Sequence, residues 1–164
     1  MDQPANHPSL TRRSALAWLS AGVALAACGS AADAKTFKVN LSDAEWRRRL
    51  TPAQFAVLRE EDTERAFTHP LNKEHRKGTF LCAGCANELY ASSTKFDSGT
   101  GWPSFWKPLP GAVGTSTDHK LGYPRTEVHC ADCGGHLGHV FRDGPKPTGL
   151  RYCMNGTAMK FRPA

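Results

Sequence analysis

The first part of the predicted domain has a helical pattern of polar and apolar residues. Ser42, with Glu45 three positions later, matches a capping box at the start of a short helix. Thr51 followed by Pro52 repeats the start signal, because proline is favoured in the first helical turn. The pattern therefore predicts two short helices, the second of which would bury Phe55, Val57 and Leu58.

Beyond residue 61 the pattern changes to short apolar runs that Gly, Pro, Asn, Asp and Ser interrupt. Such runs, separated by turn-forming residues, are typical of antiparallel strands. No alternation of strands with helices is visible, so we expect a mainly β domain with a short N-terminal helical region. The clearest predicted strands are residues 78–81, 88–91, 127–129 and 150–154.

Residues 1–34 have the pattern of an export signal. Arg12 and Arg13 precede an uncharged run, residues 15–27, that is rich in Ala and Leu. This run is shorter than the roughly 20 residues of a transmembrane helix. The paired arginines favour the twin-arginine route over an ordinary secretory signal, although no phenylalanine follows at the usual position.

Two cleavage sites compete within this signal. Residues 25–28 resemble a bacterial lipobox, in which Cys28 becomes the lipidated first residue and tethers the protein to a membrane. Cleavage after Ala34 would instead release the protein into the periplasm. We favour lipidation, because cysteine is rare and stands at the right position. Residues 35–41 are then expected to be a linker and residues 42–164 the folded domain, which we expect to be a monomer.

The charge of the chain is a weak argument for an anionic partner. The 164 residues include 21 Lys and Arg against 15 Asp and Glu, a formal net charge of +6. The positive residues are scattered, and the one run of them, residues 47–49, falls on the first predicted helix. A solvated helix face explains this run better than a nucleic-acid-binding patch, so we expect no nucleic-acid partner.

Four of the six cysteines form two C-x-x-C pairs. Each pair offers two thiolates from one tight turn, and four such sulfurs make the shell of a structural zinc ion. Disulfides are the alternative in an oxidising compartment, but two redox-type C-x-x-C disulfides in one small domain would be unusual. A complete four-cysteine shell leaves no open position for catalysis. The predicted zinc ligands are Cys82, Cys85, Cys130 and Cys133.

Cys153 is the cysteine that neither the zinc site nor the export signal explains. On a strand, Arg151, Cys153 and Asn155 would point to one face, because side chains alternate. The cation favours the reactive thiolate, and the amide can donate a hydrogen bond to a developing negative charge. A buried structural cysteine would be expected to have apolar neighbours on its own face. We therefore predict that Cys153 is a nucleophile.

Two further clusters contain candidate site residues. His136 and His139 lie among glycines, where a substrate can approach the backbone, and histidine can supply a proton near neutral pH. Asp143 follows them and could orient one imidazole by a hydrogen bond. Trp102, with Phe105 as a helper, follows a glycine-flanked turn and predicts an aromatic pocket for a small group such as a methyl. The alternatives are structural or zinc-binding histidines, although the four cysteines make further zinc ligands unnecessary, and core aromatic residues.

These motifs occur in the order seen in the B-type methionine sulfoxide reductases, which the chain resembles. Besides the two C-x-x-C pairs, the segments that match are residues 99–105, 135–141 and 151–155, and the similarity extends from about residue 42 to residue 161. The resemblance implies reduction of the R epimer of methionine sulfoxide, free or in oxidised proteins, as protein repair under oxidative stress. It also implies two antiparallel sheets, with a structural zinc away from the catalytic face.

The resemblance further implies a role for each site residue. Cys153 would attack the sulfoxide sulfur and become a sulfenic acid. His136, His139 and Asn155 would polarise or protonate the leaving oxygen. Arg151 and Asp143 would order this group and lower the thiol pKa. Trp102 and Phe105 would hold the sulfoxide methyl.

One position departs from the family pattern. Many members have a second, resolving cysteine where this chain has Thr100. With four cysteines on zinc, no spare thiol remains in the folded domain, and Cys28 would be cleaved off or lipidated. We therefore expect the sulfenic acid on Cys153 to be resolved by an external reductant, whether a thioredoxin-like domain, glutathione or a small dithiol.

The main alternative function is a zinc-ribbon-like binding module without catalysis. It explains the cysteine pairs and the basic charge, but it leaves Cys153, the two histidines and the turn at Trp102 without a purpose. A disulfide isomerase, the second alternative, would need an unmetallated C-x-x-C motif and a βαβ pattern. Replacement of Cys153 by alanine would be harmless in a binding module and fatal to a thiol enzyme.

Overall fold

The computed structural model describes residues 36–164, so the predicted export signal, Cys28 and Ala34 lie outside the described residues. Two α-helices open this part of the chain, α1 (Asp43–Arg49) and α2 (Pro52–Glu60). Both begin with a complete capping box, at Ser42 and Thr51, where the sequence predicts helix starts. No helix within residues 36–164 has the length and apolar character that a membrane span requires.

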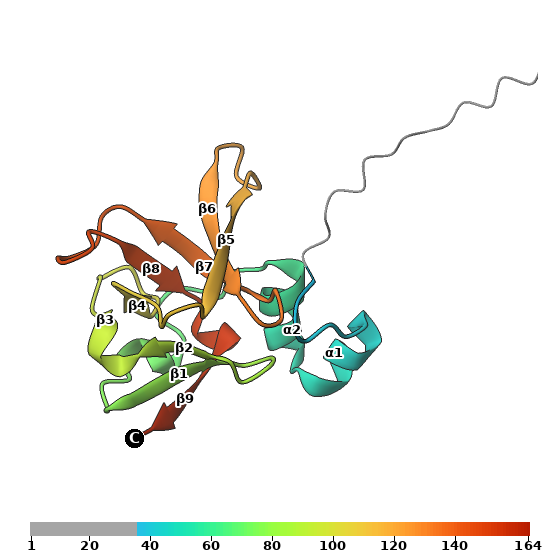
Figure 1. The fold of residues 1–164 in the computed structure, drawn as a ribbon. Coiled ribbons are helices and arrows are strands. Elements are labelled where there is room, and N and C mark those ends of the chain that lie inside the picture. Colours follow the sequence, from blue (N-terminus) through green and yellow to red (C-terminus); the bar gives the residue numbers. More distant parts are fainter. Residues whose placement is uncertain (1–35) are drawn as a thin grey trace, which may run out of the picture. The chain divides into compact units, whose positions relative to one another are not determined.

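Nine strands in the described residues form two antiparallel sheets, which confirms the expected mainly β fold (Figure 1). The smaller sheet has the order β2-β1-β9 and the larger one the order β3-β4-β8-β7-β6-β5. The structure also has three short 3-10 helices: η1 (Pro70–Lys73) follows α2, η2 (Ser92–Thr94) follows the second strand and η3 (Gly156–Ala158) precedes the last strand. The strands are β1 (Gly78–Cys82), β2 (Glu88–Ala91), β3 (Lys95–Phe96), β4 (Ser104–Phe105), β5 (Val113–Asp118), β6 (Arg125–Cys130), β7 (His136–Phe141), β8 (Arg151–Met154) and β9 (Met159–Pro163).

Aromatic side chains join the two sheets in the core. Tyr90 of β2 stacks on Phe105 of β4 with ring centroids 4.3 Å apart, and Phe80 of β1 meets Phe105 edge-on at 4.9 Å. All three are fully buried, as are Leu137 of β7 and Met154 of β8. Burial of this apolar surface stabilises the packing of one sheet on the other. The helices add Trp46, Phe55, Val57 and Leu58 to the same cluster, which includes the predicted apolar residues of α2.

The four strands predicted from the sequence correspond to β1, β2, β6 and β8. The prediction did not include β5, whose polar side chains are largely exposed in the hairpin that it forms with β6 (Figure 1). A strand with no buried face has little apolar alternation in its sequence. Residues 36–41, from the segment expected to be a linker, contact the domain, since the Val39 N–H donates to the Asp132 carbonyl at 2.8 Å.

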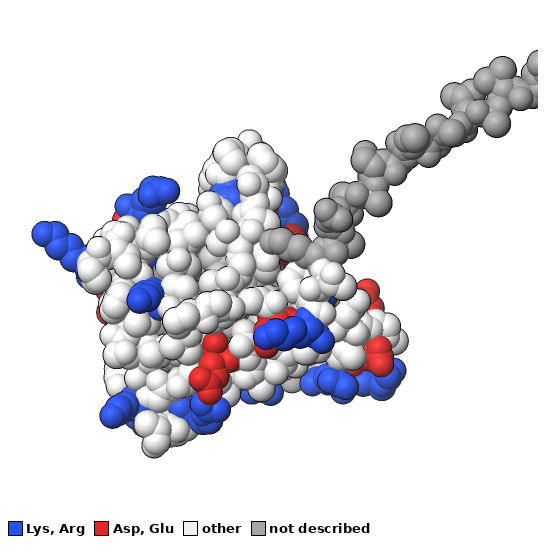
Figure 2. All heavy atoms as spheres, viewed as in Figure 1, with Lys and Arg blue, Asp and Glu red and all other residues white. Residues whose placement is uncertain are grey.

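The arginine run lies on the exposed side of α1. Arg47 pairs with Glu60 of α2 at 3.0 Å, and its guanidinium lies 3.8 Å from the centre of the Phe55 ring. Figure 2 shows basic side chains at separate places on one face of the molecule, with acidic side chains among them near the helices. The run is thus part of a solvated helix face, as the sequence pattern predicts.

Candidate functional site

Cys153 lines a cavity of about 120 Å³ on the six-stranded sheet. Its strand, β8, lies between β4 and β7, which places Ser104 and His139 directly opposite Cys153. The Oγ1 atom of Thr100 is 3.8 Å from the Cys153 sulfur. Besides Cys153 and His139, the residues that line the cavity are Thr63, Trp102, Arg125, Gly138, Phe141 and Asn155.

The alternation predicted for residues 151–155 explains how Cys153 reaches this cavity. Tyr152 and Met154 pack in the core, whereas Cys153 and Asn155 line the cavity. The neighbouring strand must come close at Gly138, because a side chain there would lie 2.1 Å from the carbonyl oxygen of Cys153. Glycine at this position therefore allows β7 and β8 to approach at the site.

Burial raises the pKa of the Cys153 thiol above its ordinary value. The hydroxyl of Thr100 and the positive charge of Arg151 act in the opposite direction, but burial outweighs them. Arg151 also shares its charge with Asp143, whose carboxylate accepts two hydrogen bonds at 2.9 and 2.8 Å. Arg151 thus acts to lower the thiol pKa, as predicted. Its effect is smaller than that of burial, so the net pKa is raised. Asp143 orients Arg151 and not an imidazole, which corrects one of the two expectations for it.

His139 is oriented by Asp118, a residue that was not predicted from the sequence. The Nε2 atom of His139 is 2.7 Å from Oδ2 of Asp118, and Arg125 binds the same oxygen. Hydrogen bonds from the backbone of Lys120 and from His139 lower the pKa of Asp118 to about 2. Burial lowers the pKa of His139, and Asp118 acts against this shift. With Asp118 ionised, Nε2 holds a proton, and Nδ1 is the nitrogen left for a ligand in the cavity.

His136 lies beside His139, with ring centroids 5.3 Å apart, but it lines a second cavity of about 360 Å³ along β5. Its Nδ1 atom is 2.8 Å from Oε1 of Glu127, and the other Glu127 oxygen is 3.6 Å from Nδ1 of His129. Although burial acts to raise it, hydrogen bonds from His129, His136 and Ser116 hold the pKa of Glu127 well below its usual range. His136 therefore does not line the Cys153 cavity itself, but its ring lies beside that of His139, which does.

Trp102 and Asn155 form an aromatic wall and an amide wall of the cavity. Trp102 is half-buried, and its Nε1–H donates to the carbonyl of Glu64 at 3.1 Å. Asn155 is 3% exposed, and its Nδ2 donates to the Leu137 carbonyl at 3.2 Å. Phe141 adds a second aromatic ring. The cavity thus combines a thiol, an imidazole and an amide with an aromatic surface.

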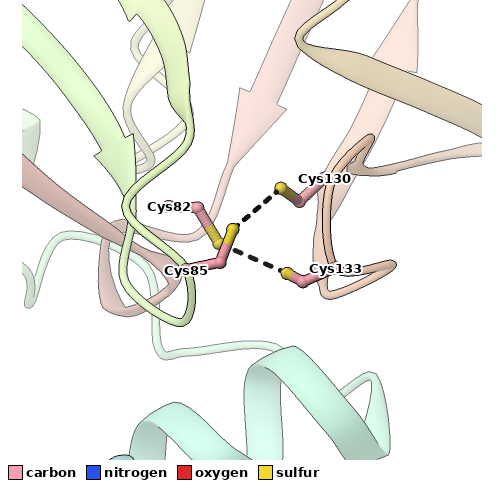
Figure 3. Close-up of side chains that lie close together, drawn as sticks. All are labelled: Cys82, Cys85, Cys130 and Cys133. Carbon is pink, nitrogen blue, oxygen red and sulfur yellow. Dashed lines mark hydrogen bonds between the residues drawn. The ribbon is translucent and has the colours of Figure 1, made fainter. Parts of the chain in front are cut away.

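The four paired cysteines converge between the two sheets, with their sulfurs facing one another (Figure 3). All four sulfurs lie within 4.8 Å of one another, with Cys82 and Cys133 3.7 Å apart and Cys85 and Cys130 3.5 Å apart. All four cysteines are free in this structure, so neither C-x-x-C pair forms a disulfide, in which the sulfurs would be about 2.05 Å apart. A tetrahedral zinc ion with Zn–S bonds of about 2.3 Å separates its sulfurs by about 3.8 Å. The residues therefore fit one zinc ion.

This metal site joins the β1–β2 turn of the smaller sheet to the β6–β7 turn of the larger one. Its binding energy would therefore stabilise the contact between the sheets. None of its four cysteines lines the Cys153 cavity, which agrees with a structural metal. Cys153 is the one cysteine of residues 36–164 that lies outside the metal site.

Comparisons with known proteins agree with this geometry. The profile of the SelR domain matches residues 50–163. The chain belongs to the SelR domain family. Relatives named peptide methionine sulfoxide reductase MsrB include one from Agrobacterium fabrum, 58% identical over 127 residues that cover 77% of this chain and 94% of the relative. Another, from Bradyrhizobium diazoefficiens, is 55% identical over 136 residues, covering 80% of this chain and 98% of the relative.

One expected substrate-binding residue of this SelR domain lies elsewhere. Phe105 is fully buried against Tyr90 and does not line the cavity, so its assignment to the methyl pocket is wrong. Its neighbour Ser104 lies opposite Cys153 and contacts the thiol. Since successive side chains of a strand point to opposite faces, Phe105 must face the core. Phe141 supplies the second aromatic ring instead.

Three charged residues of the SelR site were not predicted from the sequence: Asp118, Arg125 and Glu127. Alternation along β6 could have found two of them, because Arg125 and Glu127 lie on one face of the strand. Asp118 had no such signal, since it meets His139 only after the β5–β6 hairpin has folded back along the sheet. A fourth residue, Glu64, contacts both Trp102 and Asn155 from a segment without regular secondary structure.

Proposed function

We propose that this SelR domain protein is an oxidoreductase that reduces methionine (R)-sulfoxide, in proteins or free, to methionine. The observation that supports this most strongly is a cysteine outside the metal site, in a cavity that also presents an imidazole, an amide and aromatic rings. A volume of about 120 Å³ admits the end of one side chain rather than a folded segment. The relatives are named for methionine sulfoxide reduction.

In the reaction, the sulfur of Cys153 attacks the sulfoxide sulfur and takes over the oxygen. The substrate sulfur is reduced to the thioether of methionine, and Cys153 is oxidised to a sulfenic acid. Burial favours the neutral thiol, so the thiol proton must be removed as the attack proceeds. His139 can accept this proton at Nδ1 and deliver it to the departing oxygen, so that no proton is gained or lost.

The walls of the cavity offer different contacts to the methyl group and to the oxygen, and so can distinguish the two epimers. A sulfoxide sulfur has three different substituents, and its configuration is determined once three of its contacts are assigned. Trp102 and Phe141 offer an apolar surface to the methyl group, while Asn155 and His139 offer hydrogen bonds to the oxygen. The rest of the bound substrate must then extend out of the open side of the cavity. The other epimer would exchange the methyl group and the oxygen.

Recycling of the sulfenic acid requires a thiol from outside the domain. Thr100, the residue whose hydroxyl lies 3.8 Å from the Cys153 sulfur, has no thiol, and the other four cysteines of residues 36–164 form the metal site. Two electrons from an external dithiol, or from two monothiols, would return Cys153 to the thiol and release water. A thioredoxin-like domain, glutathione or a small dithiol could supply them.

We infer the location of the protein from the sequence of residues 1–34, which lie outside the described structure. Arg12 and Arg13 before an uncharged run support export by the twin-arginine route, and Cys28 at a lipobox supports a lipid tether in the periplasm. That route transports folded proteins, so zinc could bind before export. Mass spectrometry of the mature protein would show whether it begins at a lipidated Cys28 or after Ala34.

The reaction is tested by supplying separate R and S methionine sulfoxide epimers with dithiothreitol to the zinc-loaded protein and to Cys153→Ser. We expect reduction of the R epimer alone, and none by the variant. Turnover of neither epimer by the folded wild type would contradict the enzyme and favour a zinc-ribbon-like binding module. Unchanged turnover by Cys153→Ser would show that another group is the nucleophile.

A further inference from the structure

The connection between α2 and η1 forms part of the wall of the Cys153 cavity. Thr63 from this connection lines the cavity, although residues 61–65 adopt no helix or strand. Such a segment needs specific hydrogen bonds to hold one conformation, because backbone groups outside regular structure have no ladder partners. Glu64 makes four of these bonds.

Glu64 contacts both recognition walls of the cavity through its backbone. Its N–H donates to Oδ1 of Asn155 at 3.0 Å, and its carbonyl accepts from Nε1–H of Trp102 at 3.1 Å. Its carboxylate accepts hydrogen bonds from the N–H groups of Gly156 and Thr157, both at 2.7 Å. The side chain thereby anchors the same residue whose backbone holds Trp102 and Asn155.

We propose that Glu64 is the positioning residue that places the Trp102 ring and the Asn155 amide on the two sides of the sulfoxide site. Trp102 precedes β4 and Asn155 follows β8, so the two are 53 positions apart in the sequence. Glu64 is hydrogen-bonded to both. This role rests on the function proposed above.

The Glu64 N–H also determines which way the Asn155 amide faces. An N–H can bond only to the oxygen end of an amide, so Oδ1 points to Glu64 and Nδ2 to the Leu137 carbonyl. An amide nitrogen has two hydrogens, and Leu137 uses one of them. The second is then available as a donor to a sulfoxide oxygen in the cavity that Asn155 lines. A flipped amide would present an acceptor there and repel that oxygen.

A second contact holds the same connection three residues later. The Phe67 N–H donates to the Gly101 carbonyl at 2.8 Å, next to Trp102. Phe67 has a φ of 66°, which is unusual for a bulky residue, and its ring lies against Gly101. Strained conformations of this kind persist where surrounding contacts require them. The connection is therefore held both by the indole of Trp102 and by the backbone of the residue before it.

Loss of the Glu64 carboxylate should act on substrate recognition and leave the nucleophile intact. Cys153 is held by β4, β7 and β8, and none of its contacts comes from Glu64. In Glu64→Ala, we expect KM for the R sulfoxide to rise and kcat to fall, with kcat/KM at least about tenfold lower. Glu64→Gln retains one acceptor oxygen and should be intermediate. The rate of Cys153 alkylation by iodoacetamide should stay within about twofold of wild type.

The experiment uses the full, zinc-loaded chain and measures both epimers with dithiothreitol. Trp102→Phe keeps a ring but removes the N–H donor to Glu64. The double variant with Glu64→Ala should therefore lose less kcat/KM than the product of the two single losses. The matched control is Glu60→Ala, which removes an exposed carboxylate paired with Arg47 and should behave as wild type. Normal kinetics of Glu64→Ala, or fully multiplicative effects, would overturn this proposal alone. Absence of wild-type turnover would overturn the proposed function together with it.

Discussion

Thr100→Cys should convert this protein into an enzyme with an internal resolving thiol. The Thr100 hydroxyl lies 3.8 Å from the Cys153 sulfur, whereas a disulfide requires about 2.05 Å, so the two sulfurs must close a gap of roughly 1.8 Å. Side-chain rotation and a small loop movement can supply this. The glycines on either side, Gly99 and Gly101, already have φ values of 71° and 92°.

The expected gain follows from tethering. A thiol held in this loop has an effective concentration in the millimolar range or above, compared with roughly 10 μM for an external protein thiol. We therefore expect the sulfenic acid on Cys153 to disappear about a hundredfold faster in the variant than by such a reductant. The new thiol attacks the sulfenic acid sulfur, forms the disulfide and releases water.

A single-turnover assay checks this prediction. Enzyme is mixed with one equivalent of methionine (R)-sulfoxide and dimedone, which traps sulfenic acids, without reductant. Wild type should form methionine and a dimedone adduct on Cys153, whereas Thr100→Cys should form methionine and a disulfide instead. Ser98→Cys is the matched control, because the Ser98 hydroxyl contacts Thr100 and Ser104. A persistent adduct in Thr100→Cys would refute the geometric reasoning.

Three further predictions concern the metal, a carboxylate and the core. Cys133→Ser should lose zinc and unfold at a lower temperature in circular dichroism. Binding of a structural zinc ion contributes about 10–16 kcal/mol, whereas the net stability of a domain is about 5–15 kcal/mol. An unchanged melting temperature would contradict the metal site. The pKa of Asp118 is about 2 in the folded protein and 3.8 ordinarily, so the stability that its carboxylate adds is lost as the pH falls from 3.8 to about 2. Melting curves of Asp118→Asn should lack this loss. In the same variant the pKa of His139 should fall, and kcat with it, as a pH–rate profile would show. Phe105→Ala should cost about 3–5 kcal/mol in denaturant unfolding while KM of the folded enzyme stays unchanged; a large rise in KM would return Phe105 to the substrate pocket.

Local signals in the sequence predicted much of the molecule. The helix starts at Ser42 and Thr51 need residues only three positions away, and both are confirmed. The two C-x-x-C pairs indicated the metal ligands, because metal chemistry constrains the residue type and the short spacing within each pair. Alternation along one strand placed Cys153 and Asn155 on the same side.

The sequence by itself thus determined the metal ligands and the mainly β class, and it predicted Cys153 as the nucleophile, since each of these depends on residue type and on spacing over a few positions. Only the tertiary structure decided that Phe105 belongs to the core and Phe141 to the cavity, and that Asp118 rather than Asp143 meets an imidazole. Those contacts depend on strand register and on how one sheet packs on the other. Both are set by the sum of many weak interactions between residues far apart in the chain, which no single local pattern contains.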